Sequence, residues 1–244
     1  MQQKVIKLGV SGALGKMGSR ILTLASQDRD FKIALALERA GHPQANSSVA
    51  GLVVASSAEG IKDIDVLIDF SSPQATSEHV ALCLACKKPL VVGTTGLSEA
   101  QKSEVSKAAQ EIPIVFAPNM SVGVNLLYAL VRRAAETLPS DYSVRMTEAH
   151  HIHKKDAPSG TAKWLQQLVC QLRKQEHVDI QSVREGEIIG DHEVVFDSPW
   201  DTIRISHSAK TRDIFAKGAL AAAKFVVTKK KGLFTMTDVI GASR

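Results

Sequence analysis

The sequence predicts an α/β protein with a Rossmann-like, doubly wound parallel sheet in its first half and an α+β region after it. Two observations predict the parallel sheet: short apolar runs alternate with helix-like segments as far as Pro118, and a glycine-rich turn follows the first of these runs. A third observation predicts the second region, because later runs alternate apolar and polar residues as an open antiparallel or mixed sheet does.

Each element of the first half follows from its own residue pattern. The apolar run at 65–70 is typical of a parallel strand buried on both faces. Pro73 after Ser72 marks a helix start, and Ser98 before Glu99 is a suitable N-cap. The expected strands are 4–10, 31–37, 65–70, 89–92 and 114–117. The expected helices between them are 16–26, 73–85 and 98–110.

In the second half, the predicted helices and strands no longer alternate regularly. A long helical pattern ends before Pro139, and a second one carries leucines and a valine along one side. An Ala-rich helix near the end is followed by a lysine-rich turn and a short tail. The expected helices are 121–137, 159–174 and 212–228, and the expected strands are 143–148, 180–184, 187–196 and 202–207.

Composition sets limits on the function. The chain has 244 residues, 44% hydrophobic and 23% charged, which suits one large or two modest globular domains and argues against disorder. The apolar runs are too short for a membrane span, and from the first residues we expect no secretory signal peptide. A net charge of +5 with 5% aromatic residues gives no nucleic-acid platform. Three cysteines, including Cys83 and Cys86 inside a predicted helix, indicate core thiols in a reducing cytoplasm.

A glycine-rich loop follows the first predicted strand and opens the first helix. Its spacing is G-x-x-G-x-x-G, with Ala13 where the strict dinucleotide-binding pattern has its first glycine. Glycines let a backbone approach a pyrophosphate at a helix N-terminus. Alone, the motif fits a structural turn equally well. As a cofactor-binding loop it comprises Gly12, Ala13, Leu14, Gly15, Lys16, Met17 and Gly18.

An acidic residue lies where dinucleotide-binding domains usually bind the adenosine ribose. Glu38 follows the second predicted strand, twenty residues after Gly18. Arg39 comes next, and either Arg39 or Lys16 could neutralise a 2′-phosphate. Alternatively, Glu38 and Arg39 lie in a solvated turn and bind no cofactor. The mixed signature predicts the use of both NADH and NADPH.

A segment rich in histidine and lysine joins the strand at 143–148 to the helix at 159–174. Three imidazoles and two ammonium groups lie beside the start of that helix, which favours a site for a small dianion. His150 or Lys154 could donate a proton there. A zinc site is the first alternative, but H-H-x-H matches no common ligand spacing, and no cysteine or carboxylate joins it at close range. We therefore expect no metal. A solvated loop is the second alternative.

These motifs resemble the 4-hydroxy-tetrahydrodipicolinate reductase family, also called dihydrodipicolinate reductase, of bacterial lysine and diaminopimelate biosynthesis. The resemblance covers essentially the whole chain, and the histidine-lysine block is its most specific part. The matching segments are 12–18, 36–39, 93–96, 118–125, 148–161 and 232–240.

The resemblance implies two domains with separate functions. Residues 1–120 and 212–244 would form a dinucleotide-binding domain, and residues 121–211 an inserted α+β domain for substrate binding and oligomerisation. The family transfers a hydride from NADH or NADPH to C4 of a cyclic hydroxy-imine dicarboxylate, with loss of water. It usually forms homotetramers.

The resemblance also implies roles for individual residues. His150 and Lys154 are the expected proton donors. The expected carboxylate ligands are His151, Lys154, Gly160 and Thr161. The expected nicotinamide-side residues are Gly93, Thr94, Thr95, Ala117, Pro118, Asn119 and Met120.

One feature departs from the family pattern. Family members carry a longer stretch, with a loop containing glycine and arginine, before the strand that matches 182–193. Its loss here puts the subunit contacts in doubt. Two other readings stay open: an aspartate- or homoserine-type dehydrogenase, which would lack the histidine-lysine block, and a silent dinucleotide sensor, which would lack His150 and Lys154.

Overall fold

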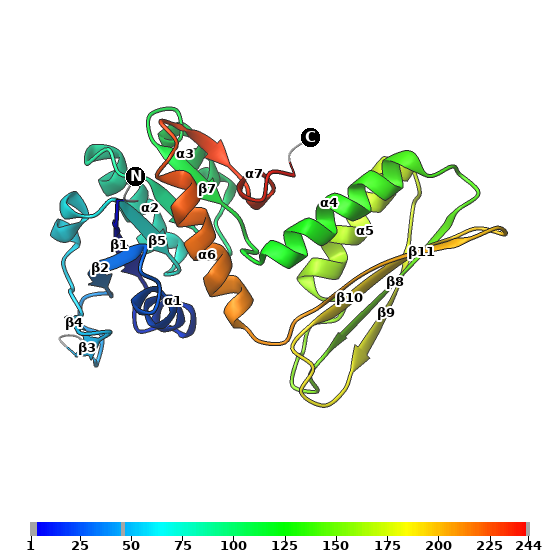
Figure 1. Cartoon of the computed structure of the whole chain (residues 1–244), viewed down its shortest axis with the longest axis horizontal. Helices are drawn as coiled ribbons and strands as arrows, with labels where there is room; N and C mark the ends of the chain where they lie inside the picture. Colours follow the sequence, from blue (N-terminus) through cyan, green and yellow to red (C-terminus); the bar gives the residue numbers. More distant parts are fainter. Residues whose placement is uncertain (1–3, 45–46, 243–244) are drawn as a thin grey trace. The chain divides into compact units, whose positions relative to one another are not determined.

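The protein folds into two compact units, described here from a computed structural model that covers residues 4–44 and 47–242 (Figure 1). Unit 1 runs up to Ser121 and also contains Phe215–Gly241. Unit 2 is Val122–Ile214 and also includes Ala242. Unit 1 is therefore discontinuous in sequence, and unit 2 is inserted into it. Among the described residues, every helix is too short or too polar to cross a membrane.

Unit 1 is built on a six-stranded sheet in the order β12-β7-β6-β5-β1-β2. Every neighbouring pair of strands in it is parallel, which confirms the predicted Rossmann-like sheet. In chain order the strands are β1 (Ile6–Ser11), β2 (Phe31–Leu37), β5 (Val66–Asp69), β6 (Leu90–Val92), β7 (Pro113–Phe116) and β12 (Gly232–Phe234). A small hairpin of β3 (Ser48–Val49) and β4 (Leu52–Val53) lies outside this sheet.

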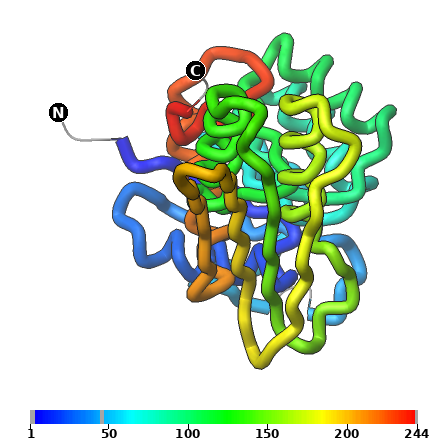
Figure 2. The backbone as a smooth tube through the Cα atoms, turned by 90° about the vertical axis from the view of Figure 1, so that its right-hand side faces the viewer, coloured from blue at the N-terminus to red at the C-terminus, as the bar shows by residue number. Residues whose placement is uncertain are grey.

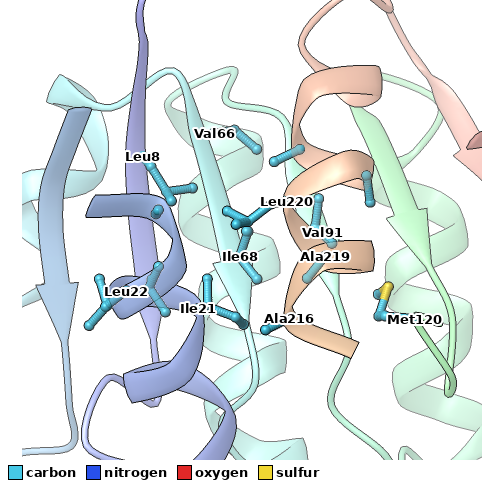
Figure 3. Close-up of a cluster of buried hydrophobic side chains, with 14 of the residues drawn as sticks. Leu8, Ile21, Leu22, Val66, Ile68, Val91, Met120, Ala216, Ala219 and Leu220 are labelled. Atoms are coloured by element: carbon cyan, nitrogen blue, oxygen red, sulfur yellow. The ribbon is translucent and has the colours of Figure 1, made fainter. Parts of the chain in front are cut away.

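Helices cover the sheet because their apolar sides need burial. They are α1 (Lys16–Ser26), η1 (Ala58–Asp63), α2 (Pro73–Ala85), α3 (Glu99–Ala108), α6 (Asp213–Val226) and α7 (Met236–Val239). Leucines and isoleucines of α1 and of the central strands meet small residues of α6 in one core cluster (Figure 3). A Cβ atom at Gly218 of α6 would lie 1.7 Å from the carbonyl oxygen of Met120. Only glycine therefore lets α6 approach this backbone so closely.

Unit 2 pairs two helices with a mixed four-stranded sheet in the order β11-β10-β8-β9. Its elements are α4 (Val122–Thr137), β8 (Ser143–His150), α5 (Gly160–Arg173), β9 (Asp179–Arg184), β10 (Asp191–Asp197) and β11 (Thr202–Ser208). The four strands lie side by side in Figure 2. Their alternate residues, such as Met146, Val194 and Phe196, pack against Leu165 and Val169 of α5.

The structure corrects two local expectations. The strand expected at 187–196 begins only at Asp191, because Gly186 has a φ of +49° and residues 185–190 form the connection from β9. The expected tail after the lysine-rich turn contains β12, which pairs with β7. A strand of three residues is too short to show a periodicity in the sequence.

Candidate active site

The glycine loop of unit 1 is a tight turn that needs its glycines. Gly12 has a φ of +75°, and a Cβ atom there would lie 2.3 Å from the carbonyl oxygen of Phe70. A Cβ atom at Gly18 would lie 2.0 Å from the carbonyl oxygen of Gly12. Gly15 is the N-cap of α1 and offers no side chain to its first-turn amides. The loop therefore presents backbone N–H groups of the kind that bind a phosphate.

Glu38 is joined to this loop by hydrogen bonds. One carboxylate oxygen accepts a hydrogen bond from the Leu14 N–H at 3.1 Å, and the other accepts one from the Arg39 N–H at 3.0 Å. The Ala13 N–H donates to the carbonyl oxygen of Leu37 at 3.1 Å. The predicted ribose ligand and the phosphate loop thus lie together, while the side chains of Lys16 and Arg39 are exposed.

The predicted nicotinamide-side residues follow two neighbouring strands, β6 and β7. The Gly93 N–H donates to the carbonyl oxygen of Asp69, and the Ala117 N–H donates to that of Val92. Thr94 and Met120 are buried, whereas Thr95 is exposed. Both segments therefore lie at the carboxyl edge of the sheet, where parallel α/β folds bind ligands. Pro118 and Asn119 lie in the second of these segments, and the Asn119 side-chain oxygen accepts from the Ser121 N–H.

A buried polar network supports this edge, and its histidine was not among the predicted site residues. Asp69, fully buried at the end of β5, lies 3.0 Å from the Nδ1 atom of His79. The same carboxylate accepts a hydrogen bond from the Thr94 hydroxyl, and Ser71 donates both its N–H and its hydroxyl to it. The Ser11 hydroxyl lies 3.5 Å from the other nitrogen of His79. The available signal was the helical spacing of His79 with the buried Thr76 and Cys83.

Cys83 has a buried side chain in α2, and Cys86 is the residue that caps this helix. Burial raises the pKa of the Cys83 thiol far above its usual range, so the group stays protonated. Both thiols are free, as expected for core or half-buried cysteines.

In unit 2, the predicted proton donor His150 ends β8 and pairs with a buried carboxylate. The Nδ1 atom of His150 lies 2.5 Å from Glu148, which is 0% exposed. The guanidinium group of Arg184 binds both oxygens of Glu148, at 2.8 and 3.0 Å. Burial lowers the pKa of His150, although the carboxylate opposes this shift. Neither Glu148 nor Arg184 was among the predicted site residues, and the expectation that no carboxylate joins the histidines at close range was wrong.

The start of α5 adjoins this pair. The Ser159 hydroxyl accepts a hydrogen bond from the Ala162 N–H and so caps the helix, and it lies 3.1 Å from the Nε2 atom of His192. The rings of His150 and His192 make an edge-on contact with centroids 5.3 Å apart. Burial lowers the pKa of His192 to about 4, so this ring is neutral at physiological pH. His192 is another member of the site that its sequence position did not reveal.

The other predicted substrate residues belong to the segment that leads into α5 or to the first turn of that helix. Lys154 reaches both carboxylate oxygens of Asp156 at 2.8 Å. His151 has a buried Nδ1 atom with no hydrogen-bond partner in the part of the chain that the structure describes, and its Nε2 atom lies 3.4 Å from Arg212. Gly160 is the first residue of α5, and the Thr161 side chain hydrogen-bonds to Tyr128. A Cβ atom at Gly160 would meet no atom within 4 Å, so the helix start is open.

Residues 4–44 and 47–242 contain no group of three or more histidine, cysteine, aspartate or glutamate side chains arranged to hold a metal ion. Glu148 does approach His150, but Arg184 already occupies both of its oxygens. His153 points elsewhere, with its Nε2 atom 3.7 Å from the exposed Glu187.

The parallel sheet with its phosphate loop, and the inserted unit with its cluster of titratable side chains, define a nucleotide-dependent oxidoreductase. The models of the N-terminal and C-terminal parts of dihydrodipicolinate reductase match residues 6–120 and 123–240. The chain therefore belongs to the dihydrodipicolinate reductase family.

Relatives support this assignment along the whole chain. The 4-hydroxy-tetrahydrodipicolinate reductase of Nitrosomonas eutropha is 38% identical over 264 residues, covering 97% of this chain and 98% of the relative. That of Geobacter sulfurreducens is also 38% identical, covering 96% and 98%. Because the first alignment spans 264 positions and this chain has 244 residues, at least 20 positions have no counterpart here. This difference fits the predicted loss of a loop.

Solved structures show the same fold. The dihydrodipicolinate reductase of Paenisporosarcina sp. TG-14, solved with dipicolinate, has a TM-score of 0.84 at 23% identity, covering 97% of this chain and 99% of that one. The aspartate dehydrogenase of Thermotoga maritima has a TM-score of 0.54 at 11% identity, covering 90% and 96%. The class of enzyme kept as an alternative above therefore shares the fold but little of the sequence.

Proposed function

We propose that this protein reduces 4-hydroxy-tetrahydrodipicolinate to tetrahydrodipicolinate in lysine and diaminopimelate biosynthesis, with NADH or NADPH as the reductant. The observation that carries the proposal is the buried Glu148–His150 pair beside the open N-terminus of α5. It lies in the most specific sequence block of a family to which the whole chain belongs. A charge-paired carboxylate, an imidazole and the N-terminus of a helix suit a substrate that carries two carboxylates and needs a proton.

The residues divide into two sets of roles. The glycine loop would hold the pyrophosphate, Glu38 the adenosine ribose, and the residues after β6 and β7 the nicotinamide side. When bound to these residues, the nucleotide would supply the hydride for C4 of the substrate. His150 and Lys154 would supply the proton that lets the C4 hydroxyl leave as water, so that one hydride and one proton are consumed for each water released. His151, Lys154, Gly160 and Thr161 would bind the carboxylates.

The two units would share this work as the family pattern implies. Residues 1–120 and 212–244 would bind the dinucleotide, and residues 121–211 would bind the substrate and form subunit contacts. Homotetramers in the cytoplasm are the expected state. Size-exclusion chromatography with light scattering tests the tetramer, and a monomer or dimer would show that the shortened connection has removed contacts.

The decisive test is a coupled assay with freshly generated 4-hydroxy-tetrahydrodipicolinate. Loss of NADH or NADPH absorbance, with tetrahydrodipicolinate as the product, is the expected result. Aspartate with NAD⁺ serves as the comparison substrate, and turnover of aspartate alone would favour the dehydrogenase alternative. Binding of NADH without turnover of either substrate would favour the silent sensor. Either of these outcomes would overturn the proposal.

A further inference from the structure

Glu148 is the first residue of the histidine-lysine block, residues 148–161. Neither its position nor its residue type predicted a role in the site. It is the sixth residue of β8 and has no exposed surface. Its oxygens contact three different segments: the ring of His150, the guanidinium group of Arg184 at the end of β9, and the Ser159 N–H at 3.3 Å. A buried carboxylate needs this many partners because burial alone strongly disfavours its charge.

The charge on Glu148 decides where His150 carries its proton. Despite burial, the hydrogen bonds from Arg184 and other neighbours hold the pKa of Glu148 at about 2, so the group is a carboxylate at neutral pH. A carboxylate can only accept hydrogen bonds, so the Nδ1 atom of His150 must be the protonated one. In the neutral ring the lone pair is then on Nε2.

The Nε2 atom of His150 is available for chemistry. It has no hydrogen-bond partner among residues 4–44 and 47–242. A Cβ atom at Gly190 would lie only 3.1 Å from it, so a side chain at that position would crowd the ring. Glycine therefore keeps space beside the nitrogen that Glu148 leaves free.

The Glu148–Arg184 pair also holds the loop that follows His150. Arg184 donates a second hydrogen bond, at 2.6 Å, to the carbonyl oxygen of Asp156. Glu148 accepts the hydrogen bond of the Ser159 N–H, three residues further on. One ion pair therefore fixes both His150, where the loop begins, and the residues that lead into α5. Removing it would loosen the segment that carries Lys154.

We propose that Glu148 and Arg184 are positioning residues of this enzyme. Glu148 keeps one proton of His150 on Nδ1, so that Nε2 is the nitrogen that takes up a second proton and passes it to the substrate, while Arg184 balances the charge of Glu148 and ties the segment 151–159 to the same point. The effect on turnover rests on the proposed function. The state of the His150 ring does not, because it is a property of the folded protein.

Other charged groups near His150 do not replace Glu148. Lys154 and Arg184 are cations that lower the pKa of His150, as does burial. His192 is neutral at pH 7 and contacts the ring through its edge. Glu148 is the neighbour that raises this pKa, through its hydrogen bond and its charge. Loss of its charge should therefore move the titration of His150 to lower pH.

The test is Glu148→Gln, which keeps the shape of the side chain and removes its charge. Glu193→Gln is the matched control: Glu193 lies on the neighbouring strand β10, pairs with Thr147 and faces the other side of the sheet. The ¹⁵N spectrum of histidine-labelled protein reports the tautomer, with the His150 signals assigned by their loss in His150→Gln. We expect Nδ1–H alone in the wild type and in Glu193→Gln, and a mixture in Glu148→Gln.

Kinetics give a second readout. In Glu148→Gln we expect kcat to fall by roughly 10- to 100-fold with KM changed by less than about 3-fold, as for a lost contribution to proton transfer. The pH profile of kcat should also shift to lower pH, which a purely structural defect would not cause. An unchanged tautomer with near-parental kcat would refute the role of Glu148. Wild-type protein without reductase activity would refute the proposed function instead, and the spectrum would still test the tautomer.

Arg184→Lys keeps the test decisive if Glu148→Gln does not fold. Lysine retains the charge but lacks the planar fork that reaches Glu148 and Asp156 together. We expect the Nδ1–H tautomer to persist while the substrate KM rises by roughly 5-fold or more, because the segment 151–159 is less well held. An unchanged KM would refute the role of Arg184 in holding the loop.

Discussion

The buried ring of His192 makes unit 2 sensitive to mild acid, and replacing it with glutamine should remove much of that sensitivity. His192 is 6% exposed, and burial lowers its pKa from 6.5 to about 4. The folded protein therefore keeps this ring neutral in a range where the unfolded chain binds a proton. Glutamine retains a polar group for Ser159, the hydrogen-bond partner of the ring, but does not titrate.

The sign and size of the effect follow from the two pKa values. Below pH 6.5 the unfolded state gains a proton that the folded state gains only below about 4, so the free energy of unfolding falls between these pH values. The full loss is about 3 kcal/mol, and about 2 kcal/mol of it is reached by pH 5. Between pH 7 and pH 5, the free energy of unfolding of His192→Gln should therefore fall by about 2 kcal/mol less than that of the wild type.

Urea unfolding at pH 7, 6 and 5, at constant ionic strength, measures this difference. Tryptophan fluorescence is the suitable probe, since Trp164 and Trp200 both belong to unit 2. His177→Gln is the control, because His177 is an exposed histidine of the same unit. If His192→Gln and the wild type lose the same free energy of unfolding between pH 7 and pH 5, the ring is not held neutral and the reasoning is wrong.

Three further predictions concern the cofactor, the substrate and the core. Arg39→Ala should raise the KM for NADPH by roughly 5-fold and leave that for NADH nearly unchanged, since an exposed ion pair is worth about 1 kcal/mol; equal losses would place the 2′-phosphate elsewhere. Lys154→Ala should lower kcat and raise KM together, unlike Lys163→Ala on the exposed side of α5, in steady-state assays. Gly218→Ala should lower the free energy of unfolding by at least about 2 kcal/mol in urea titrations, because its new methyl group would meet the backbone of Met120; a neutral result would mean that α6 can move away.

Local patterns predicted the regular elements well. Both α1 and β2 have the bounds expected from the sequence, because amphipathic spacing and short β-rich runs are properties of neighbouring residues. The connection at 185–190 was harder to predict from the sequence. Ile188 and Ile189 continue the apolar run of the next strand, and nothing in the residue types reveals that Gly186 turns the chain there.

The site was predictable in its motifs but not in its supporting contacts. The glycine loop and the histidine-lysine block are contiguous in sequence, so their residues stay together in any fold. The partners of Glu148 and Thr94 come from other elements: Arg184 lies 36 residues from Glu148, and Asp69 lies 25 residues from Thr94. Such pairs depend on strand order and register, which one sequence does not specify.

The discontinuity of unit 1 has a consequence for the order of events during synthesis. Its core cluster includes Ala216, Ala219 and Leu220 of α6, and β12 completes its sheet. When a ribosome has released the first 121 residues, the surface that α6 will cover is still exposed to water. The stretch Val122–Ile214 contains α4, α5 and the four strands β8–β11 of unit 2, and it leaves the ribosome before the part of α6 that belongs to unit 1. The inserted unit can therefore finish folding first, and the unit that contains the N-terminal residues finishes last.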